Sequence, residues 1–347
     1  MERRRRNQVF FQQPGRLGSL QGKTEFRSFS VTKNSPKMKN LRLLTILLAL
    51  NIFNPIRSQE GESILLRADD FGMSHAVNLA LKDMVNTGIP FNASVMMVTP
   101  WVQEAADILK EAPHVSVGLH LTLTSEFEQL KWGPISGKAS VPSLVDERGF
   151  FRTSVKEFLL SDYDLAEVEI ELRSQIDRAM TMGMNVDYLD HHMGIARSTP
   201  EIAAVVEKLA EEYDLVICRY FDEHMAADIW GRPVDKKKSS VLEAMKELDA
   251  ERFNLFVFHT AHDNDELARL DDRNTDLMSD PETGQSILGK HRQAELNVFL
   301  SEEFKRALEG KKIQTYGDLK NNHSDEMKRG GIIHASMEEA RAAYSSR

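Results

Sequence analysis

The chain has 347 residues, of which 41% are hydrophobic and 28% are charged, and its formal net charge is −9. The first 57 residues hold 12 Lys and Arg against two Glu, so the remainder holds 32 basic and 51 acidic residues, a net charge of −19. This acidic balance, with no basic stripe to offset it, excludes nucleic acid and polyanionic glycans as partners and favours a neutral or cationic ligand.

Residues 1–58 are predicted to form an N-terminal extension that contains a secretory signal. Lys39 and Arg42 provide a basic start, and the apolar residues 43–53 that follow are too few to span a bilayer comfortably. We therefore expect synthesis from Met38 and export, either to a periplasm or out of the cell.

Two alternatives to this signal stay open. Residues 1–37 are rich in Arg and Ser and poor in acids, which is also typical of an organellar transit peptide. No small-residue cleavage pattern precedes Gln59, so an N-terminal membrane anchor is the second alternative.

The only cysteine, Cys218, lies in an apolar run and is expected to be a buried core residue without a disulfide.

Strand and helix signals alternate from about residue 63 onward. Ser74 is suited to cap the first helix, and Gly88 to the left-handed turn that ends it. Thr199 and Pro200 mark the start of a later helix. The predicted elements are strand 64–67, helix 74–87, strand 93–98, helix 101–111, strand 115–117, helix 166–182, strand 186–189, a helix from 199, a strand around 216, helix 241–248, strand 254–258, helix 291–308 and strand 313–316.

About seven β/α units are typical of an α/β protein, and we predict an irregular TIM-like (β/α) barrel with about seven strands over residues 59–320. Residues 321–347 are predicted to be a polar C-terminal tail with a short helix at 337–344. Two stretches interrupt the alternation. Residues 125–164, with several Gly and Pro, are expected to shape the ligand site, and the polar residues 263–285 either to bind the ligand or to form a solvated loop.

Three short segments carry polar residues directly after predicted strands. In a β/α fold the carboxyl ends of the strands meet at one rim, so these residues are expected to lie together. One carboxylate and two imidazoles can hold a divalent cation and leave positions free for water and substrate. The segments are Ala68-Asp69-Asp70-Phe71-Gly72, Gly118-Leu119-His120-Leu121 and Asp190-His191-His192-Met193-Gly194.

Each motif alone has a simpler interpretation. Adjacent acids after a strand are often solvated, and an isolated histidine in an apolar strand is more often a core residue than a ligand. Periodicity alone does not choose between His191 and His192, although strand alternation places Asp190 and His192 on the same face. Asp190 could orient a metal ligand or bind the substrate amine.

Together the three segments resemble the YdjC-like carbohydrate deacetylase family, whose members remove N-acetyl groups from amino sugars. The likeness runs from about residue 64 to about residue 319. Carried over by position, it implies one divalent ion, Mg²⁺ or Zn²⁺, and an N-acetylated sugar or oligosaccharide as substrate. It implies metal ligands at Asp70, His120 and His192, a catalytic base at Asp69, and a late family histidine at His259.

The chain departs from the family pattern at two positions. Thr260 follows His259 where the family usually has proline, and Gly194 stands where a further histidine often occurs. Because a basic amine must leave protonated, His259 is expected to donate that proton, with His262 as the alternative acid.

The expected function is a metal-dependent hydrolase that removes N-acetyl groups by attack of metal-activated water. The departures at Gly194 and Thr260 suggest one alternative, a catalytically impaired exported sugar-binding protein. A metal-dependent hydrolase with another substrate is a further alternative. An Asp-His-His set also occurs in non-haem iron oxygenases. A glycosidase would need its two acids on opposite sides of the scissile bond rather than adjacent. A homodimer is left open.

Overall fold

The computed structural model describes residues 61–345. The extension, signal and anchor predicted for residues 1–58 lie outside the described residues. Within the described part of the chain, no helix combines the length and the hydropathy needed to cross a bilayer.

The described strands form one sheet, and all of their ladders are parallel. The sheet has the order β5-β4-β3-β2-β1-β7-β6, and β8 pairs with the first residues of β1. No ladder joins β5 to β6 among the described strands, so the barrel is open there. The strands are β1 Ser63–Phe71, β2 Phe91–Val95, β3 Val115–Leu121, β4 Val186–His191, β5 Val216–Ile217, β6 His224–Met225, β7 Asn254–Phe258 and β8 Lys312–Gln314.

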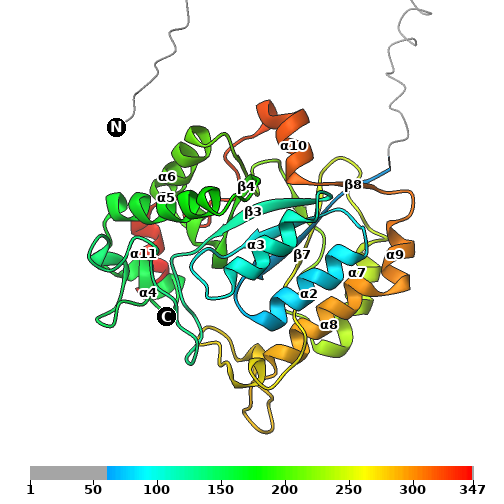
Figure 1. Cartoon of the computed structure of the whole chain (residues 1–347), viewed down its shortest axis with the longest axis horizontal. Coiled ribbons are helices and arrows are strands. Elements are labelled where there is room, and N and C mark those ends of the chain that lie inside the picture. Colours follow the sequence, from blue (N-terminus) through cyan, green and yellow to red (C-terminus); the bar gives the residue numbers. More distant parts are fainter. Residues whose placement is uncertain (1–60, 346–347) are drawn as a thin grey trace, which may run out of the picture. The chain divides into compact units, whose positions relative to one another are not determined.

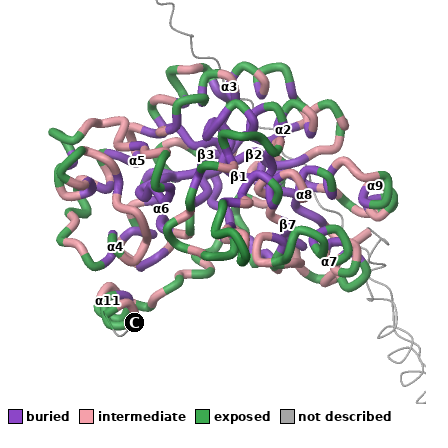
Figure 2. Tube along the Cα trace, turned by 90° about the horizontal axis from the view of Figure 1, so that it is seen from below, coloured by how far each residue is buried: buried purple, intermediate pink, exposed green. Residues whose placement is uncertain are grey.

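The α-helices surround this sheet, as Figure 1 shows. Buried residues concentrate along β1, β2 and β3 and on the sides of the helices that face them (Figure 2). The predicted α/β fold and irregular TIM-like barrel are therefore confirmed, with a curled sheet in place of a closed cylinder. The helices are α2 His75–Asn86, α3 Val102–Lys110, α4 Val155–Leu160, α5 Leu165–Thr181, α6 Pro200–Glu212, α7 Lys237–Ala244, α8 Leu288–Leu300, α9 Glu302–Leu308, α10 Tyr316–His323 and α11 Met337–Ser345.

The central strand β1 is buried on both faces, as expected for a parallel sheet covered by helices. Ile64 and Leu66 belong to the main core beneath the helices, whereas Leu65 belongs to a second cluster inside the curl. The period of two along the strand then places Arg67 and Asp69 on the same inner side as Leu65. The interior thus changes from apolar to polar toward the carboxyl ends of the strands.

Gly118 makes room for an aromatic ring inside the curl. The ring of Tyr188 lies so close that a Cβ at position 118 would stand 2.1 Å from it. Tyr188 packs against Tyr316, with 4.5 Å between the ring centroids, and its hydroxyl lies 2.9 Å from Ser94 Oγ. The Gly118 backbone therefore positions the ring that forms the floor of the polar region.

One local prediction needs correction, some elements were not predicted, and one short helix is confirmed. The helix predicted at 291–308 is two helices, α8 and α9, because Ser301 is extended and caps α9 through its hydroxyl. The sequence interpretation missed β6, α4 and α10. The short helix predicted at 337–344 is present as α11, and it packs against α4.

Replacing Gly118 with Ala is expected to destabilise the fold by about 3 kcal/mol, because the new methyl group overlaps the Tyr188 ring. Gly137→Ala is the control. Position 137 has open space but a φ of 80°, so that substitution is expected to cost about 1 kcal/mol for backbone conformation alone. Chemical denaturation measures both, and equal losses would contradict the packing role of Gly118.

Candidate functional site

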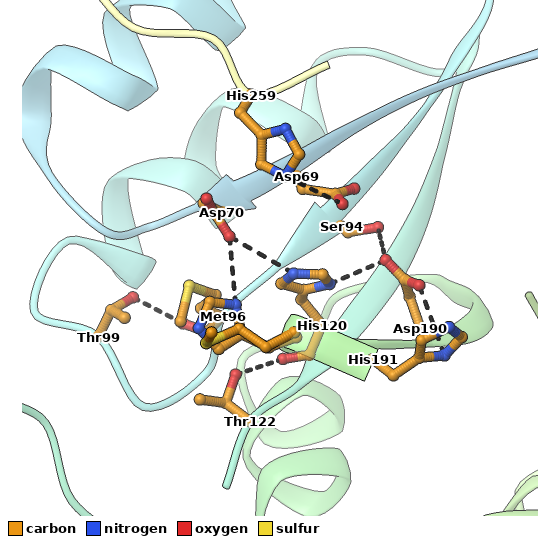
Figure 3. Close-up of polar contacts among 12 residues, drawn as sticks. Asp69, Asp70, Ser94, Met96, Thr99, His120, Thr122, Asp190, His191 and His259 are labelled. Carbon is orange, nitrogen blue, oxygen red and sulfur yellow. Dashed lines mark hydrogen bonds and ion pairs between the residues drawn. The ribbon is translucent and has the colours of Figure 1, made fainter. Parts of the chain in front are cut away.

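The structure brings Asp70, His120 and His192 together at the carboxyl ends of β1, β3 and β4. The Nε2 atom of His120 lies 3.4 Å from Asp70 Oδ1, and the Nδ1 atom of His192 lies 3.5 Å from the same oxygen. All three side chains are buried, and one ligand atom from each lies within 4.8 Å of the others. Figure 3 shows Asp70 beside His120, with Asp69 and His259 next to each other.

A local change of backbone geometry directs the Asp70 side chain toward His120 and His192. Strict alternation would point Asp70 away from the inner face that carries Asp69. The pairing of β1 with β2 shifts register between Ala68 and Phe71, and Asp70 has a φ of 69°. Such left-handed conformations of a non-glycine residue cost about 1–3 kcal/mol and concentrate at functional sites. Both adjacent acids therefore reach the same region.

The Asp70 carboxylate has the features of a cation ligand. Its Oδ2 accepts a hydrogen bond from Arg292 Nη2 at 2.6 Å. Its Oδ1 is buried without a hydrogen-bond partner among the described residues, and it faces both imidazoles. Its contacts there are the two long ion pairs to the imidazoles, so a cation between the three atoms would stabilise this oxygen further. The residues present fit one divalent ion with three protein ligands.

Carboxylates hold the far nitrogen of each candidate imidazole ligand. Asp190 Oδ2 lies 2.8 Å from His120 Nδ1, and Glu126 Oε2 lies 2.9 Å from His192 Nε2. Such partners fix the ring orientation and make the ligating nitrogen more basic. Asp190 also accepts hydrogen bonds from Ser94 Oγ and from Arg67, so protein groups engage both of its oxygens. This geometry suits the orienting role of Asp190 better than contact with a substrate.

The surrounding acids give the imidazoles a strong preference for positive charge. Burial lowers the pKa of His120, but Asp190 and Asp69 outweigh it and raise that pKa to about 9. Burial likewise lowers the pKa of His192, but Glu126 and Asp70 raise it to about 10. The field at this point therefore favours a cation.

Arg67 fixes the second acid of the pair. Its Nε and Nη2 atoms bind the two oxygens of Asp69 at 2.8 Å each, and its Nη1 donates to Asp190 at 2.8 Å. Burial raises the pKa of Asp69, although Arg67 opposes this shift. A carboxylate with a raised pKa accepts a proton more readily near neutral pH.

His259 stands across from Asp69, with 3.8 Å between its Nε2 and Asp69 Oδ2. Its backbone N donates to Glu295 Oε2 at 2.6 Å, and its ring packs on Trp230 at 4.6 Å between centroids. Glu295 in turn pairs with Lys237 at 2.6 Å, and both side chains are fully buried. Burial, reinforced by Arg292, lowers the pKa of His259 to about 3, so its imidazole is neutral.

The two rival histidines lie differently. His191 Nδ1 is 3.7 Å from Asp190, and this ring does not join the Asp70 group. His262 Nε2 lies 2.8 Å from Asp83 and is not among the residues that line the cavity at the metal site.

The candidate centre opens into a cavity of about 600 Å³ whose rim includes both predicted loops. Phe127 and Asp272 form an isolated bridge between residues 125–164 and 263–285, and Arg273 N donates to Glu126 O. This contact between the loops places Glu126 beside His192.

Sequence reasoning missed several residues of the site. Arg67 carried a signal, because a charged residue two positions before Asp69 faces the same side of the strand. Glu126 and Trp230 lie in irregular segments and carried none. The departure at Gly194 has a structural account: its φ is 75°, and a Cβ there would lie 2.9 Å from Ile333 Cδ1.

A curled parallel β/α sheet with an Asp-His-His group at its carboxyl rim is the architecture of a barrel-type metal site. The comparison with known families agrees: residues 63–310 match the family model described as YdjC-like protein, and the chain belongs to this family.

Relatives of the chain carry the name carbohydrate deacetylase. One, from Thermoanaerobacter pseudethanolicus, is 27% identical over 220 residues, which cover 63% of this chain and 80% of the relative. Another, from Brevibacillus brevis, is 35% identical over 150 residues, 43% of this chain and 56% of the relative. The crystal structure of a protein from Enterococcus faecalis V583 matches this chain with a TM-score of 0.59 and 22% identity. That protein is provisionally described as a cellobiose-phosphate cleavage protein. The match covers 75% of this chain and 99% of that chain, and it supports the fold alone.

Replacing Asp70, His120 or His192 singly with Ala is expected to lower metal occupancy markedly, because only two protein ligands remain. His191→Ala is the matched control, since its ring lies outside the group. Elemental analysis of the purified variants measures the bound metal. Full occupancy in all three variants would contradict the site, and a greater loss in His191→Ala than in His192→Ala would select the other histidine.

Proposed function

We propose that the protein is a metal-dependent carbohydrate deacetylase that hydrolyses the N-acetyl group of an amino sugar. The observation that carries this proposal is the Asp70 oxygen that faces two imidazoles without a hydrogen bond, beside the Asp69 carboxylate that Arg67 holds at both oxygens. Membership of the YdjC-like family and the names of the relatives support the same reaction.

Asp70, His120 and His192 would hold one divalent ion, for which we propose Mg²⁺ or Zn²⁺. The bound ion would supply Lewis acidity for the acetyl carbonyl and would lower the pKa of a water ligand. Asp190 and Glu126 keep the imidazoles oriented, and Arg292 holds the second oxygen of Asp70 away from the cation position.

Proton movement would involve Asp69 and His259. Asp69, fixed at both oxygens by Arg67, would accept the proton of the attacking water. His259 is neutral in the free protein, so it would receive a proton during the reaction before it donates one. Asp69, whose Oδ2 lies 3.8 Å from His259 Nε2, would be the source of that proton once the two atoms approach to hydrogen-bond distance, and His259 would pass it to the leaving nitrogen as the C–N bond breaks.

The alternatives are less well supported by this geometry. A glycosidase needs two acids flanking a bond, whereas Asp69 and Asp70 are adjacent in the chain and each has a carboxylate oxygen within 4.8 Å of a ring nitrogen of His120. A sugar-binding protein would need neither an aligned base nor a neutral imidazole opposite it. We further propose export of the protein, which is supported by the basic start at Lys39 and Arg42 before the apolar residues 43–53.

The metal-loaded protein is expected to release acetate from at least one member of a panel of N-acetylated mono- and oligosaccharides. Acetate is measured directly, with and without a chelator, and in the absence of oxygen. Dependence on oxygen would favour the oxygenase alternative. Saturable sugar binding without release of acetate would favour the sugar-binding alternative.

Asp69→Asn is expected to retain the metal and to lose activity about a hundredfold to ten-thousandfold, because the amide cannot accept the water proton. Asp187→Asn is the control, since Asp187 lies on the same sheet but does not line this cavity. Acetate release and metal content are measured on both variants. Near-normal turnover would exclude Asp69 as the base, and loss of metal would make it a ligand.

A further inference from the structure

A fully buried ion pair adjoins His259, outside the groups of residues that could hold a metal. Lys237 Nζ lies 2.6 Å from Glu295 Oε1, and neither side chain has exposed surface. A buried ion pair adds little net stability compared with apolar side chains of similar volume. Stability alone therefore does not explain why the pair is present, and its contacts toward the cavity indicate another role.

Each member of the pair holds a segment that carries a ring of the cavity wall. Lys237 Nζ also donates to Ile229 O at 2.9 Å and to Trp230 O at 3.3 Å. Glu295 Oε2 accepts from His259 N at 2.6 Å. Trp230 and His259 both line the cavity, and their ring centroids lie 4.6 Å apart. The ion pair thus fixes two neighbouring rings from the protein side.

The two ring nitrogens of His259 have different surroundings. Nε2 lies 3.8 Å from Asp69 Oδ2, and Figure 3 shows this edge of the ring turned toward Asp69. Nδ1 is buried, and no residue that the structure describes forms a hydrogen bond with it. Glu295 Oε2 lies 3.9 Å from Nδ1. The side chain of His259 is 22% exposed, so water and substrate can reach the ring from the cavity but cannot reach Nδ1.

This difference bears on which nitrogen carries the proton of the neutral ring, because the surroundings of a histidine select its tautomer. With the proton on Nε2, the Nδ1 lone pair would face the Glu295 carboxylate, and no water would relieve the repulsion. With the proton on Nδ1, the N–H faces that negative charge, and the Nε2 lone pair opens on the cavity. Burial raises the pKa of Glu295, but Lys237 opposes this shift and so favours the ionised carboxylate.

Asp69 is the competing carboxylate, because it lies close to Nε2. Arg67, however, pairs with both oxygens of Asp69, which weakens the attraction of Asp69 for a proton on Nε2. In Glu295 the cation Lys237 pairs with Oε1, whereas Oε2, the oxygen near Nδ1, accepts from a neutral backbone N–H. The field around the ring therefore favours a proton on Nδ1.

We propose that Glu295 is a positioning residue that selects the Nδ1–H tautomer of His259, and that the buried Lys237 keeps Glu295 ionised and in place. The inference rests on the proposed deacetylase function for its part in the reaction. Nε2 then has the free lone pair that receives the proton from Asp69 and passes it to the leaving nitrogen. The Nδ1–H bond stays intact throughout, and Glu295 stabilises the imidazolium between the two transfers without itself being protonated.

The tautomer can be measured by nitrogen-15 NMR of ring-labelled histidines in the full chain loaded with Mg²⁺ or Zn²⁺. The signals of His259 are assigned by their loss in His259→Gln. The wild type is expected to show a protonated Nδ1 and an unprotonated Nε2. Glu295→Gln retains an oxygen for the His259 backbone N–H but has no charge, so we expect it to shift the population toward Nε2–H.

A double variant and a matched control complete this measurement. Lys237→Met/Glu295→Gln leaves neither charge unpaired in the interior, so it provides the same test if the single variant does not fold. Glu171→Gln is the control, since Glu171 is equally buried but accepts from Ile135 N and Ser136 N outside the cavity. It is expected to leave the His259 signals unchanged. A protonated Nε2 in the wild type, or the same tautomer in the wild type and in both Glu295 variants, would overturn the proposal.

Acetate release from the N-acetylated sugars separates the tautomer from the reaction. Both Glu295 variants are expected to lower kcat about tenfold to a hundredfold at unchanged metal content and with little change in KM, because His259 is present but less often in the competent tautomer. If acetate is released and kcat stays normal although the tautomer has shifted, the role of Glu295 in the reaction is wrong and the deacetylase function stands. If the tautomer shifts as expected but no sugar releases acetate, the selection of the tautomer stands and the deacetylase function is wrong.

Discussion

The rest of the site depends on the contacts of the buried Arg67 guanidinium with Asp69 and Asp190. The guanidinium binds Asp69 through two nitrogens and Asp190 through the third, and Asp190 in turn holds His120. One side chain thus connects the candidate base to a candidate metal ligand through rigid, charge-assisted hydrogen bonds. Removing one partner of such a buried set leaves an uncompensated charge and costs about 3–5 kcal/mol, so the position of the base and the stability of the sheet are coupled.

Strand geometry explains why this contact can form at all. Alternation puts Leu65, Arg67 and Asp69 on the inner side of β1, and the same rule aims His120 and Asp190 inward from β3 and β4. Asp70 breaks the rule through its left-handed backbone, and the result is two adjacent carboxylates with separate partners. Arg292 takes one oxygen of Asp70, which leaves the other oxygen for a cation.

Much of the fold was predictable from the sequence, because buried parallel strands and amphipathic helices leave strong local patterns. The site was predictable where its residues follow strands, as Asp70, His120 and His192 do. Glu126 was not predictable, since a bridge between two irregular loops positions it. The break at Ser301 did leave a local signal, a capping serine followed by Glu302 and Glu303, which the sequence interpretation overlooked. The strand β6 has only two residues, too few to form a pattern.

The charges of the buried cluster connect these observations. Asp69, Asp70, Glu126 and Asp190 contribute four carboxylates, and Arg67 and Arg292 contribute two guanidiniums. With neutral imidazoles the cluster therefore has an excess of two negative charges, which a single divalent ion balances. Protons on His120 and His192 would balance the same excess, and this is why the acids raise the pKa of both rings. Because an ion and the protons would compete for the same two nitrogens, binding of a metal ion at the Asp70 oxygen would displace these protons.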